Sequence, residues 1–170
     1  LLLKIAQKYR RTADPVKRVN QLRSDIIRPG TKLKIDQSEY LIRVDTTKHE
    51  LCLYRIWQDS TNFVKAYSVG TGKNENTPIG AFKITLKQKN PTWYKPGGSA
   101  IPFGSPENLL GTRWLGIDCP GFGIHGTWEP ESVGMSSSLG CVRMLNEEVE
   151  ELADLVPLGT EVIIFASPKQ

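Results

Sequence analysis

Residues 124–144 read IHGTWEPESVGMSSSLGCVRM and place His125, one of two histidines in the chain, sixteen residues before Cys141. Glycines surround both side chains, at positions 123, 126, 134 and 140. Glycine permits backbone angles that other residues avoid and lets a ligand approach the main chain closely. The pattern therefore indicates two reactive side chains held on tight turns.

A cysteine and a histidine together form the minimal set for thiol acyl transfer. The imidazole takes the thiol proton, and the thiolate then attacks a carbonyl carbon. A free thiol titrates near about 8.5, so it needs a base or a positive neighbour to ionise at neutral pH. Arg143 follows Cys141 by two residues and supplies such a charge. Backbone N–H groups around Gly140 and Cys141 would stabilise the developing oxyanion.

Two other interpretations of His125 and Cys141 stay open from the residues alone. A buried cysteine is often an inert small hydrophobe, and a lone histidine often has a structural role. A zinc site is a further alternative, but one histidine and one cysteine leave two ligands unfilled. Cys119 and His49 would complete a set only if the fold brought them to the same place. We therefore expect neither a metal nor a cofactor.

The chain around this stretch is predicted to be mostly β, with one clear helix. Residues 88–112 are rich in Pro, Gly, Ser and Asn and are predicted to form a long loop. Asn146 is predicted to cap the helix, which buries a stripe of apolar side chains. That stripe consists of Val149, Leu152, Ala153 and Val156. The predicted strands are residues 40–44, 51–57, 63–69, 81–86, 113–117, 123–125 and 160–165.

The first 36 residues are predicted to form a small separate unit, followed by a polar linker. Two apolar stripes at helical spacing indicate two helices, and a turn at residues 28–30 leads into a short strand around Leu33 and Ile35. The stripes are Leu2, Ile5, Ala6 and Tyr9, and then Val16, Val19 and Leu22. The chain opens at Leu1 rather than Met, which we interpret as a trimmed or processed start.

Composition describes a globular chain with an uneven charge distribution. The 170 residues are 39% hydrophobic and 24% charged, which excludes disorder, and no apolar run approaches the roughly 20 residues of a membrane span. The net charge is +4, yet residues 1–36 hold ten Lys or Arg against three Asp. This basic block indicates either an anionic partner or a solvated helix face. No aromatic RNA-binding pattern accompanies it, so we expect no specific nucleic acid.

Three cysteines are too few for a disulfide scaffold. Cys52 is predicted to lie in the core, because it sits in an apolar strand. Cys119 is interpreted as a bystander, a disulfide partner of Cys52, or a redox lock on Cys141, and the sequence does not decide among these. His49 lies in a polar turn and is predicted to be at the surface.

The run from His125 to Met144 closely resembles the active-site signature of the L,D-transpeptidase catalytic domain, the YkuD family. The signature begins HG and ends S-x-G-C-x-R, which here is Ser138-Leu139-Gly140-Cys141-Val142-Arg143. Upstream, residues 77–82 (TPIGAF) resemble the TPxGxF turn of the family, and residues 90–93 (NPTW) resemble its NPxW loop. The resemblance covers residues 39–167 and implies a mainly β catalytic domain, a sandwich or barrel with a short helix after the cysteine.

That resemblance implies transfer of peptidoglycan stem peptides at the bacterial cell envelope. It assigns Cys141 as the nucleophile, His125 as the base, and the Gly126 carbonyl as the group that orients the imidazole. A tetrapeptide stem would lose its terminal D-Ala and be joined to the amine of a second stem. The remaining assignments are substrate contacts by Arg143, Ser138, Gly140, Trp93 and Trp128, with packing or turn-stabilising roles as the alternative for Ser138 and the two tryptophans.

Residues 1–36 resemble a LysM module, which implies a small βααβ unit that binds glycan strands. The match lies in residues 2–9, in Asn20 and Leu22, and in residues 27–33. The first strand of such a module is missing here.

Three alternatives accompany the transpeptidase prediction. An L,D-carboxypeptidase would send the same acyl-enzyme to water, and a decayed catalytic domain would only bind the wall. A cysteine endopeptidase of the NlpC/P60 type has its cysteine before its histidine, and the order here is the reverse.

Overall fold

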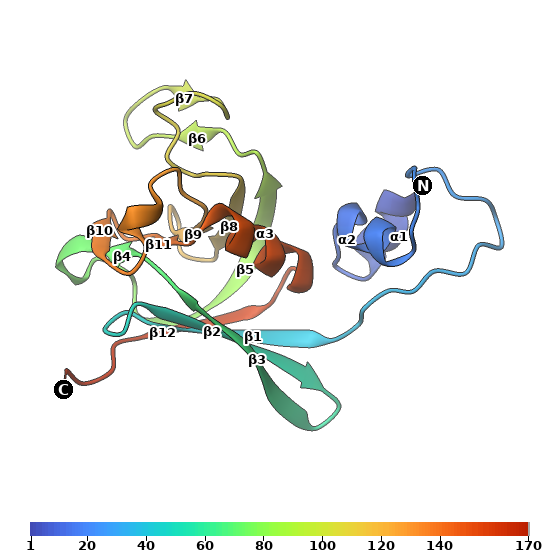
Figure 1. Ribbon diagram of the computed structural model, residues 1–170, viewed down its shortest axis with the longest axis horizontal. Helices are drawn as coiled ribbons and strands as arrows, with labels where there is room; N and C mark the ends of the chain where they lie inside the picture. Colours follow the sequence, from blue (N-terminus) through green and yellow to red (C-terminus); the bar gives the residue numbers. More distant parts are fainter. Residues whose placement is uncertain (170) are drawn as a thin grey trace.

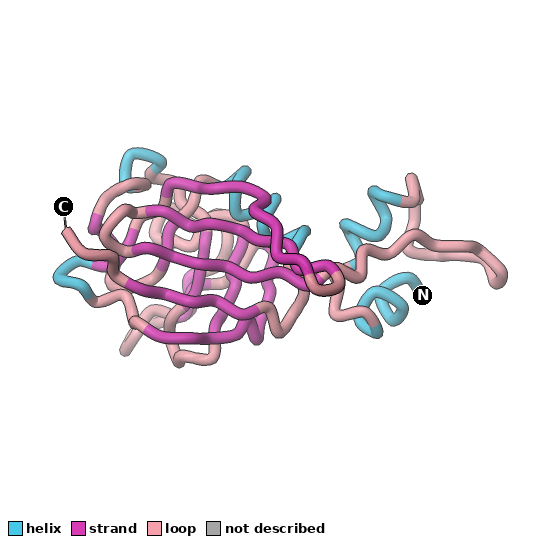
Figure 2. The backbone as a smooth tube through the Cα atoms, turned by 90° about the horizontal axis from the view of Figure 1, so that it is seen from below, coloured by secondary structure: helices cyan, strands magenta, loops and turns pink. Residues whose placement is uncertain are grey.

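The computed structural model describes residues 1–169 and consists of a curled β-sheet domain with a small helical segment at the N-terminal end (Figures 1 and 2). The helices are α1 (Leu2–Lys8), α2 (Ala13–Val19) and α3 (Asn146–Leu155), with single 3-10 turns at Lys73–Glu75 and Pro130–Ser132. The strands are β1 (Glu39–Asp45), β2 (Glu50–Trp57), β3 (Ser60–Ser68), β4 (Thr71–Gly72), β5 (Gly80–Lys89), β6 (Trp93–Tyr94), β7 (Ala100–Ile101), β8 (Arg113–Ile117), β9 (Gly123–His125), β10 (Ser136–Ser138), β11 (Val142–Arg143) and β12 (Glu161–Phe165).

Eight strands form one sheet in the order β11-β9-β8-β5-β12-β1-β2-β3, and β10 pairs separately with β4. The sheet is mixed: β1 is parallel to β12 and antiparallel to β2, and β9 is parallel to β11. Figure 2 shows these strands lying side by side across the domain. The mainly β architecture predicted for residues 39–167 is confirmed for the curled sheet and its few helices.

Alternation of side chains along β1 and β2 builds the centre of the core. Ile42 and Val44 in β1 and Leu51 and Leu53 in β2 are fully buried, because successive residues of a strand point to opposite faces. Cys52 lies between two of these leucines, so it points to the other face and is only half-buried. The prediction that Cys52 belongs to the core is therefore wrong.

Helix α3 packs against β8 and β9 and buries its apolar side chains in the same core that β1 lines. Its predicted stripe is confirmed, since Val149, Leu152 and Ala153 are buried and Val156 follows them inside. Such a helix is held by its amphipathic packing more than by its intrinsic propensity. The packing fixes the first turn of α3 against the strands that carry His125.

The predicted loop at residues 88–112 contains a short hairpin, β6 paired with β7, which projects from the domain in Figure 1. Asn108 is fully buried at its base, and its Nδ2 donates to the Pro91 and Ile101 carbonyl oxygens at 2.9 and 3.0 Å. A buried amide with satisfied donors ties the two ends of an otherwise irregular segment together.

The N-terminal segment is helical only. Helices α1 and α2 form as predicted, and Leu2, Ala6 and Val16 make a small core of their own. The strand predicted around Leu33 and Ile35 does not form, because a strand needs a hydrogen-bonded neighbour and residues 1–38 offer none. The α+β organisation predicted for residues 1–36 is therefore wrong as to its strands.

Arg11 joins this segment to the sheet domain. Its side chain is only 5% exposed, and its guanidinium donates to the Asp36, Leu155 and Ser38 carbonyl oxygens. A planar group with five donors can satisfy several carbonyls at once, so one residue fixes the helical segment beside the end of α3.

Within residues 1–169, no helix combines the length and the apolar character needed to cross a membrane.

Candidate functional site

The pairing of β9 with β11 brings the two parts of the signature together. Ile124 pairs with Val142 and His125 pairs with Arg143, while the Met144 N–H donates to the His125 carbonyl oxygen at 2.9 Å. Cys141 directly precedes β11, so the short parallel pair places the cysteine turn beside the histidine strand. His125 and Cys141, sixteen residues apart in sequence, therefore lie on neighbouring backbone segments.

His125 is held in one orientation. Its Nδ1 lies 2.6 Å from the Gly126 carbonyl oxygen and donates to it, which leaves Nε2 of the neutral ring as the acceptor. The ring is buried and stacks on Trp114, with centroids 5.9 Å apart and planes 27° from parallel. Burial, together with the positive charge of Arg143, lowers the pKa of His125 to about 4, against the opposing effect of the Gly126 hydrogen bond.

Cys141 rests as a thiol. Burial raises its pKa, while a hydrogen bond from the Gly123 backbone and the charge of Arg143 act in the opposite direction. Its Sγ lies 3.7 Å from the Gly121 carbonyl oxygen, within reach of a weak S–H donor. At neutral pH the two side chains are therefore a neutral thiol and a neutral imidazole, so forming a thiolate requires the thiol proton to be transferred.

Ser138 and Gly140 shape the turn before Cys141. The Ser138 hydroxyl donates to the Cys141 carbonyl oxygen at 2.6 Å and accepts the Gly140 N–H at 3.1 Å. Gly140 has a φ of +137°, a conformation that favours glycine. The Gly140 N–H is therefore already used, while the Cys141 N–H donates to no atom of residues 1–169 and is free for an oxyanion.

The upstream TPIGAF turn packs directly behind this loop. The Thr77 hydroxyl is buried and accepts the Gly72 N–H at 2.8 Å. A Cβ built on Gly72 would lie 2.7 Å from Gly140 Cα, so no side chain fits between the two segments. Thr77 of the TPIGAF turn thus holds Gly72, and Gly72 packs against Gly140. This contact brings the turn next to the loop that carries Cys141.

Arg143 presents a partly unused guanidinium. Its side chain is 11% exposed, its Nη1 lies 3.6 Å from Glu129 Oε2, and its buried Nε has no partner among residues 1–169. A buried N–H without an acceptor is costly, so the Nε is an energetic cost of holding Arg143 in this place.

The two predicted aromatic contacts lie in different places. Trp128 follows the histidine strand, is half-exposed, and packs on Phe103 with ring centroids 6.0 Å apart. Trp93 lies half-buried in the β6–β7 hairpin, where it pairs with Ile101. No hydrogen bond or ring contact within residues 1–169 joins either tryptophan to His125 or Cys141.

The other cysteines and the second histidine do not belong to the Cys141–His125 cluster. All three thiols are free, and Cys119 packs against the core. His49, predicted to be at the surface, is half-buried, and its Nδ1 lies 3.1 Å from the Thr71 hydroxyl. Within residues 1–169, no group of three or more His, Cys, Asp or Glu side chains is arranged to hold a metal.

Two residues at the site were missed from the sequence. Trp114 stacks on His125, and Asn146 contacts the Gly126 backbone. Neither belongs to a short motif, and only the alignment of β8 beside β9 and the docking of α3 bring them there.

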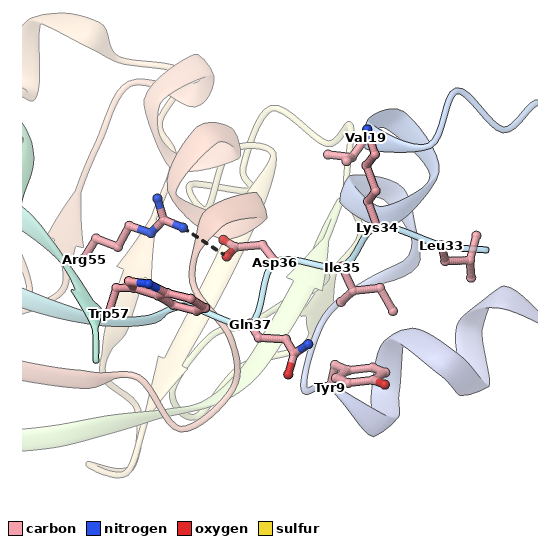
Figure 3. A pocket seen from close by; sticks show the side chains of 9 residues that line it. All are labelled: Tyr9, Val19, Leu33, Lys34, Ile35, Asp36, Gln37, Arg55 and Trp57. Carbon is pink, nitrogen blue, oxygen red and sulfur yellow. Dashed lines mark ion pairs between the residues drawn. The ribbon is translucent and has the colours of Figure 1, made fainter. Parts of the chain in front are cut away.

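A cavity of about 640 Å³ lies between the N-terminal segment and the sheet, away from Cys141 (Figure 3). An ion pair between Arg55 and Asp36, 3.7 Å apart, borders it. It is lined by Tyr9, Val19, Leu33, Lys34, Ile35, Asp36, Gln37, Arg55 and Trp57.

The low pKa of His125 predicts acid sensitivity of the fold. An unfolded histidine titrates near about 6.5, whereas the folded pKa is about 4. The unfolded state therefore binds more protons between these values, so the free energy of unfolding should fall as the pH drops through that range. Denaturant titrations across it should show a weaker pH dependence for His125→Gln than for the unchanged protein. His49→Gln is the matched control, and an equal pH dependence in H125Q would contradict the prediction.

The comparisons with known proteins agree with this geometry. The model of the YkuD family, the L,D-transpeptidase catalytic domain, matches residues 39–164. The protein YqjB of Bacillus subtilis is 48% identical over 104 residues, which are 58% of this chain and 57% of YqjB. YkuD of Bacillus licheniformis is 39% identical over 140 residues, which are 82% of this chain and 73% of that protein.

Solved structures share the fold. An L,D-transpeptidase from Mycobacterium smegmatis superposes with a TM-score of 0.61 at 21% identity, covering 79% of this chain and 65% of that one. The chain spans little more than half the length of YqjB, so these matches describe the catalytic domain. With the matching family model, they show that the chain belongs to the YkuD family of L,D-transpeptidase catalytic domains.

Proposed function

We propose that the protein is a peptidoglycan L,D-transpeptidase of the bacterial cell envelope. The observation that carries this proposal is the 2.6 Å hydrogen bond from His125 Nδ1 to the Gly126 carbonyl, beside the cysteine turn. It leaves Nε2 available to take the thiol proton. The names of relatives and solved structures, which include a faropenem adduct of a mycobacterial L,D-transpeptidase, support the same chemistry.

The proposed reaction has two acyl transfers. Cys141 Sγ attacks the carbonyl carbon before the terminal D-Ala while its proton passes to His125 Nε2. The tetrahedral intermediate, stabilised by the Cys141 N–H, collapses, and D-Ala leaves with the proton from the imidazolium. An amine of a second stem then gives its proton to Nε2 and attacks the thioester, which forms the cross-link and restores the thiol.

Supporting residues divide into turn-forming and substrate-contacting groups. Ser138 and Gly140 shape the nucleophile turn, since their polar groups are already paired with backbone. Arg143 holds a stem carboxylate with the outer nitrogens of its guanidinium, one of which lies beside Glu129 in this structure, and Trp128 with Phe103 lines the donor side. Trp93, on the β6–β7 hairpin, contacts the same stem.

The N-terminal 1–36 segment is proposed to be a LysM-like glycan-binding module, and residues 39–167 the catalytic domain. The cavity between them, with Tyr9 and Trp57 on its walls, offers aromatic and polar groups of the kind that bind sugars (Figure 3). The excess of Lys and Arg in residues 1–36 favours an anionic wall polymer as neighbour.

Product analysis tests the proposed function. Purified protein is incubated with a tetrapeptide stem, alone and with an added acceptor stem, and the products are separated by mass. We expect release of D-Ala and formation of a cross-linked dimer. Release of D-Ala without a dimer identifies a carboxypeptidase instead. If no D-Ala is released but the protein still co-sediments with isolated cell walls, it is a binding protein whose catalytic domain has decayed.

A further inference from the structure

Asn146, the first residue of α3, does not cap that helix. The cap position belongs to Leu145, and no side chain makes a capping hydrogen bond there. The cap predicted from the sequence is therefore wrong. The Asn146 Oδ1 instead accepts the Thr112 N–H at 3.1 Å, on the segment that leads into β8.

Two glycines enclose the same oxygen. A Cβ built on Gly126 would lie 2.1 Å from Asn146 Oδ1, and one built on Gly111 would lie 2.3 Å from it. The Gly111 Cβ would also lie 2.6 Å from the Thr127 nitrogen. The Asn146 side chain thus occupies the space that side chains at positions 111 and 126 would need, and it contacts both backbone segments at once.

Gly126 is the residue that orients His125. Its carbonyl oxygen accepts from His125 Nδ1, and its own N–H donates to the Arg113 carbonyl oxygen at 3.2 Å. The Arg113 carbonyl therefore holds the peptide unit before the Gly126 Cα, and the Asn146 side chain packs against that Cα, from which the orienting carbonyl follows. Removal of that side chain would leave space beside the Gly126 Cα and would leave the Thr112 N–H without its acceptor.

We propose that Asn146 is a positioning residue, whose Oδ1 fixes the Gly126 backbone and through it the orientation and tautomer of the His125 imidazole. The inference rests on the proposed function for its kinetic consequence, but the tautomer itself is a property of the folded protein. Residues that orient metal-binding side chains from behind are commonly worth about 10–100-fold in activity, and we expect the same order for a residue that orients a base.

A purely structural role in starting α3 is separable from this proposal. Glu147 and Glu148 occupy the first turn and supply the negative charge that favours a helix start. Glu147 is exposed and contributes only to the helix, so Glu147→Ala reports the effect of weakening the helix start alone. Asn62→Ala, at an exposed position of β3, is the matched control for the chemical change.

The test measures the His125 tautomer and the rate of acylation by a carbapenem in three variants, Asn146→Ala, Asn146→Ser and Asn146→Asp. Nitrogen-15 NMR at neutral pH reports which ring nitrogen carries the proton, and the chain's only other histidine is assigned through His49→Gln. The second-order rate of acylation by a carbapenem, divided by the fraction folded from circular dichroism, reports the orientation of the base.

We expect the Nδ1–H tautomer in the unchanged protein, in E147A, in N62A and in N146D, which keeps an oxygen acceptor. N146A and N146S should show a tautomer mixture and acylation about 10–100-fold slower per folded molecule. If N146A does not fold, N146S decides, because serine is tolerated at helix starts.

An unchanged tautomer and rate in a folded N146A or N146S overturns the proposal, as does an equal loss in E147A. Failure of the unchanged protein to react with a carbapenem contradicts the proposed function and leaves the tautomer result to decide on Asn146.

Discussion

Replacing Cys141 with alanine is expected to abolish formation of a covalent adduct with a carbapenem and release of D-Ala from a tetrapeptide stem. The sulfur is the only atom that the proposed reaction bonds to the substrate, so its removal takes away both acyl transfers. Loss of a nucleophile commonly costs about 10⁴-fold or more in turnover. Intact-protein mass spectrometry after incubation with the drug checks the adduct, and separation of products checks D-Ala.

The other two cysteines provide matched controls for that experiment. Cys52 is half-buried on the outer face of β2, and Cys119 packs at the edge of the core, so neither reaches the substrate in the proposed site. Cys52→Ala and Cys119→Ala should each keep one adduct per chain. An adduct that survives in C141A, or one that disappears in C119A, would refute the assignment of the nucleophile.

Replacing Gly140 with alanine is expected to disrupt the nucleophile turn. The new Cβ would lie 2.5 Å from the Phe122 ring and 3.0 Å from the Asn76 carbonyl oxygen, at a φ of +137°. A strained backbone and an overpacked site together cost about 2–4 kcal/mol, which corresponds to a fall in melting temperature of roughly 5–15 °C for a chain of this size. Acylation by a carbapenem should fall with it, since the Cys141 N–H would move.

A control variant at Gly134 distinguishes backbone strain from overpacking as the cause of the stability lost in G140A. Gly134 has a φ of +88° but nothing within 4 Å of a built Cβ. Gly134→Ala therefore carries the backbone strain alone, about 1 kcal/mol, and should keep acylation. Thermal unfolding and acylation rates of G140A and G134A are compared, and equal losses in the two variants would show that the contact with Phe122 and Asn76 does not matter.

Much of the fold could be read from local patterns. The strand predicted at residues 40–44 buries Tyr40, Ile42 and Val44 in alternation, as a half-buried sheet requires, and the α3 stripe repeats at helical spacing. The exposure of Cys52 could not be predicted in this way. In a uniformly apolar stretch, the residue types do not say which alternate side chains point into the core. Pairing with β1 and β3 decides it.

The site divides in the same way. Cys141, His125 and Arg143 stand out because their residue types and spacing form a reactive set, and Ser138 and Gly140 stand out because they flank it. Trp114 and Asn146 carry no such signal, since each reaches His125 or Gly126 only through long-range packing. An asparagine before a pair of glutamates looks like a helix cap whether or not it serves as one.

The sequence by itself determined the family and the main elements and predicted the reactive pair, because chemistry-bearing residues and periodic burial are local properties. Tertiary structure alone decided which donors around Cys141 are free, which tautomer His125 holds, and how residues 1–36 join the sheet. These features depend on which acceptor each N–H group meets. The Gly140 N–H donates to the Ser138 hydroxyl, His125 Nδ1 to the Gly126 carbonyl, and the Thr112 N–H to Asn146 Oδ1. The acceptors of Gly140 and His125 are sequence neighbours, but packing against distant segments sets the backbone conformation that presents them, and the Thr112 acceptor itself comes from a distant helix.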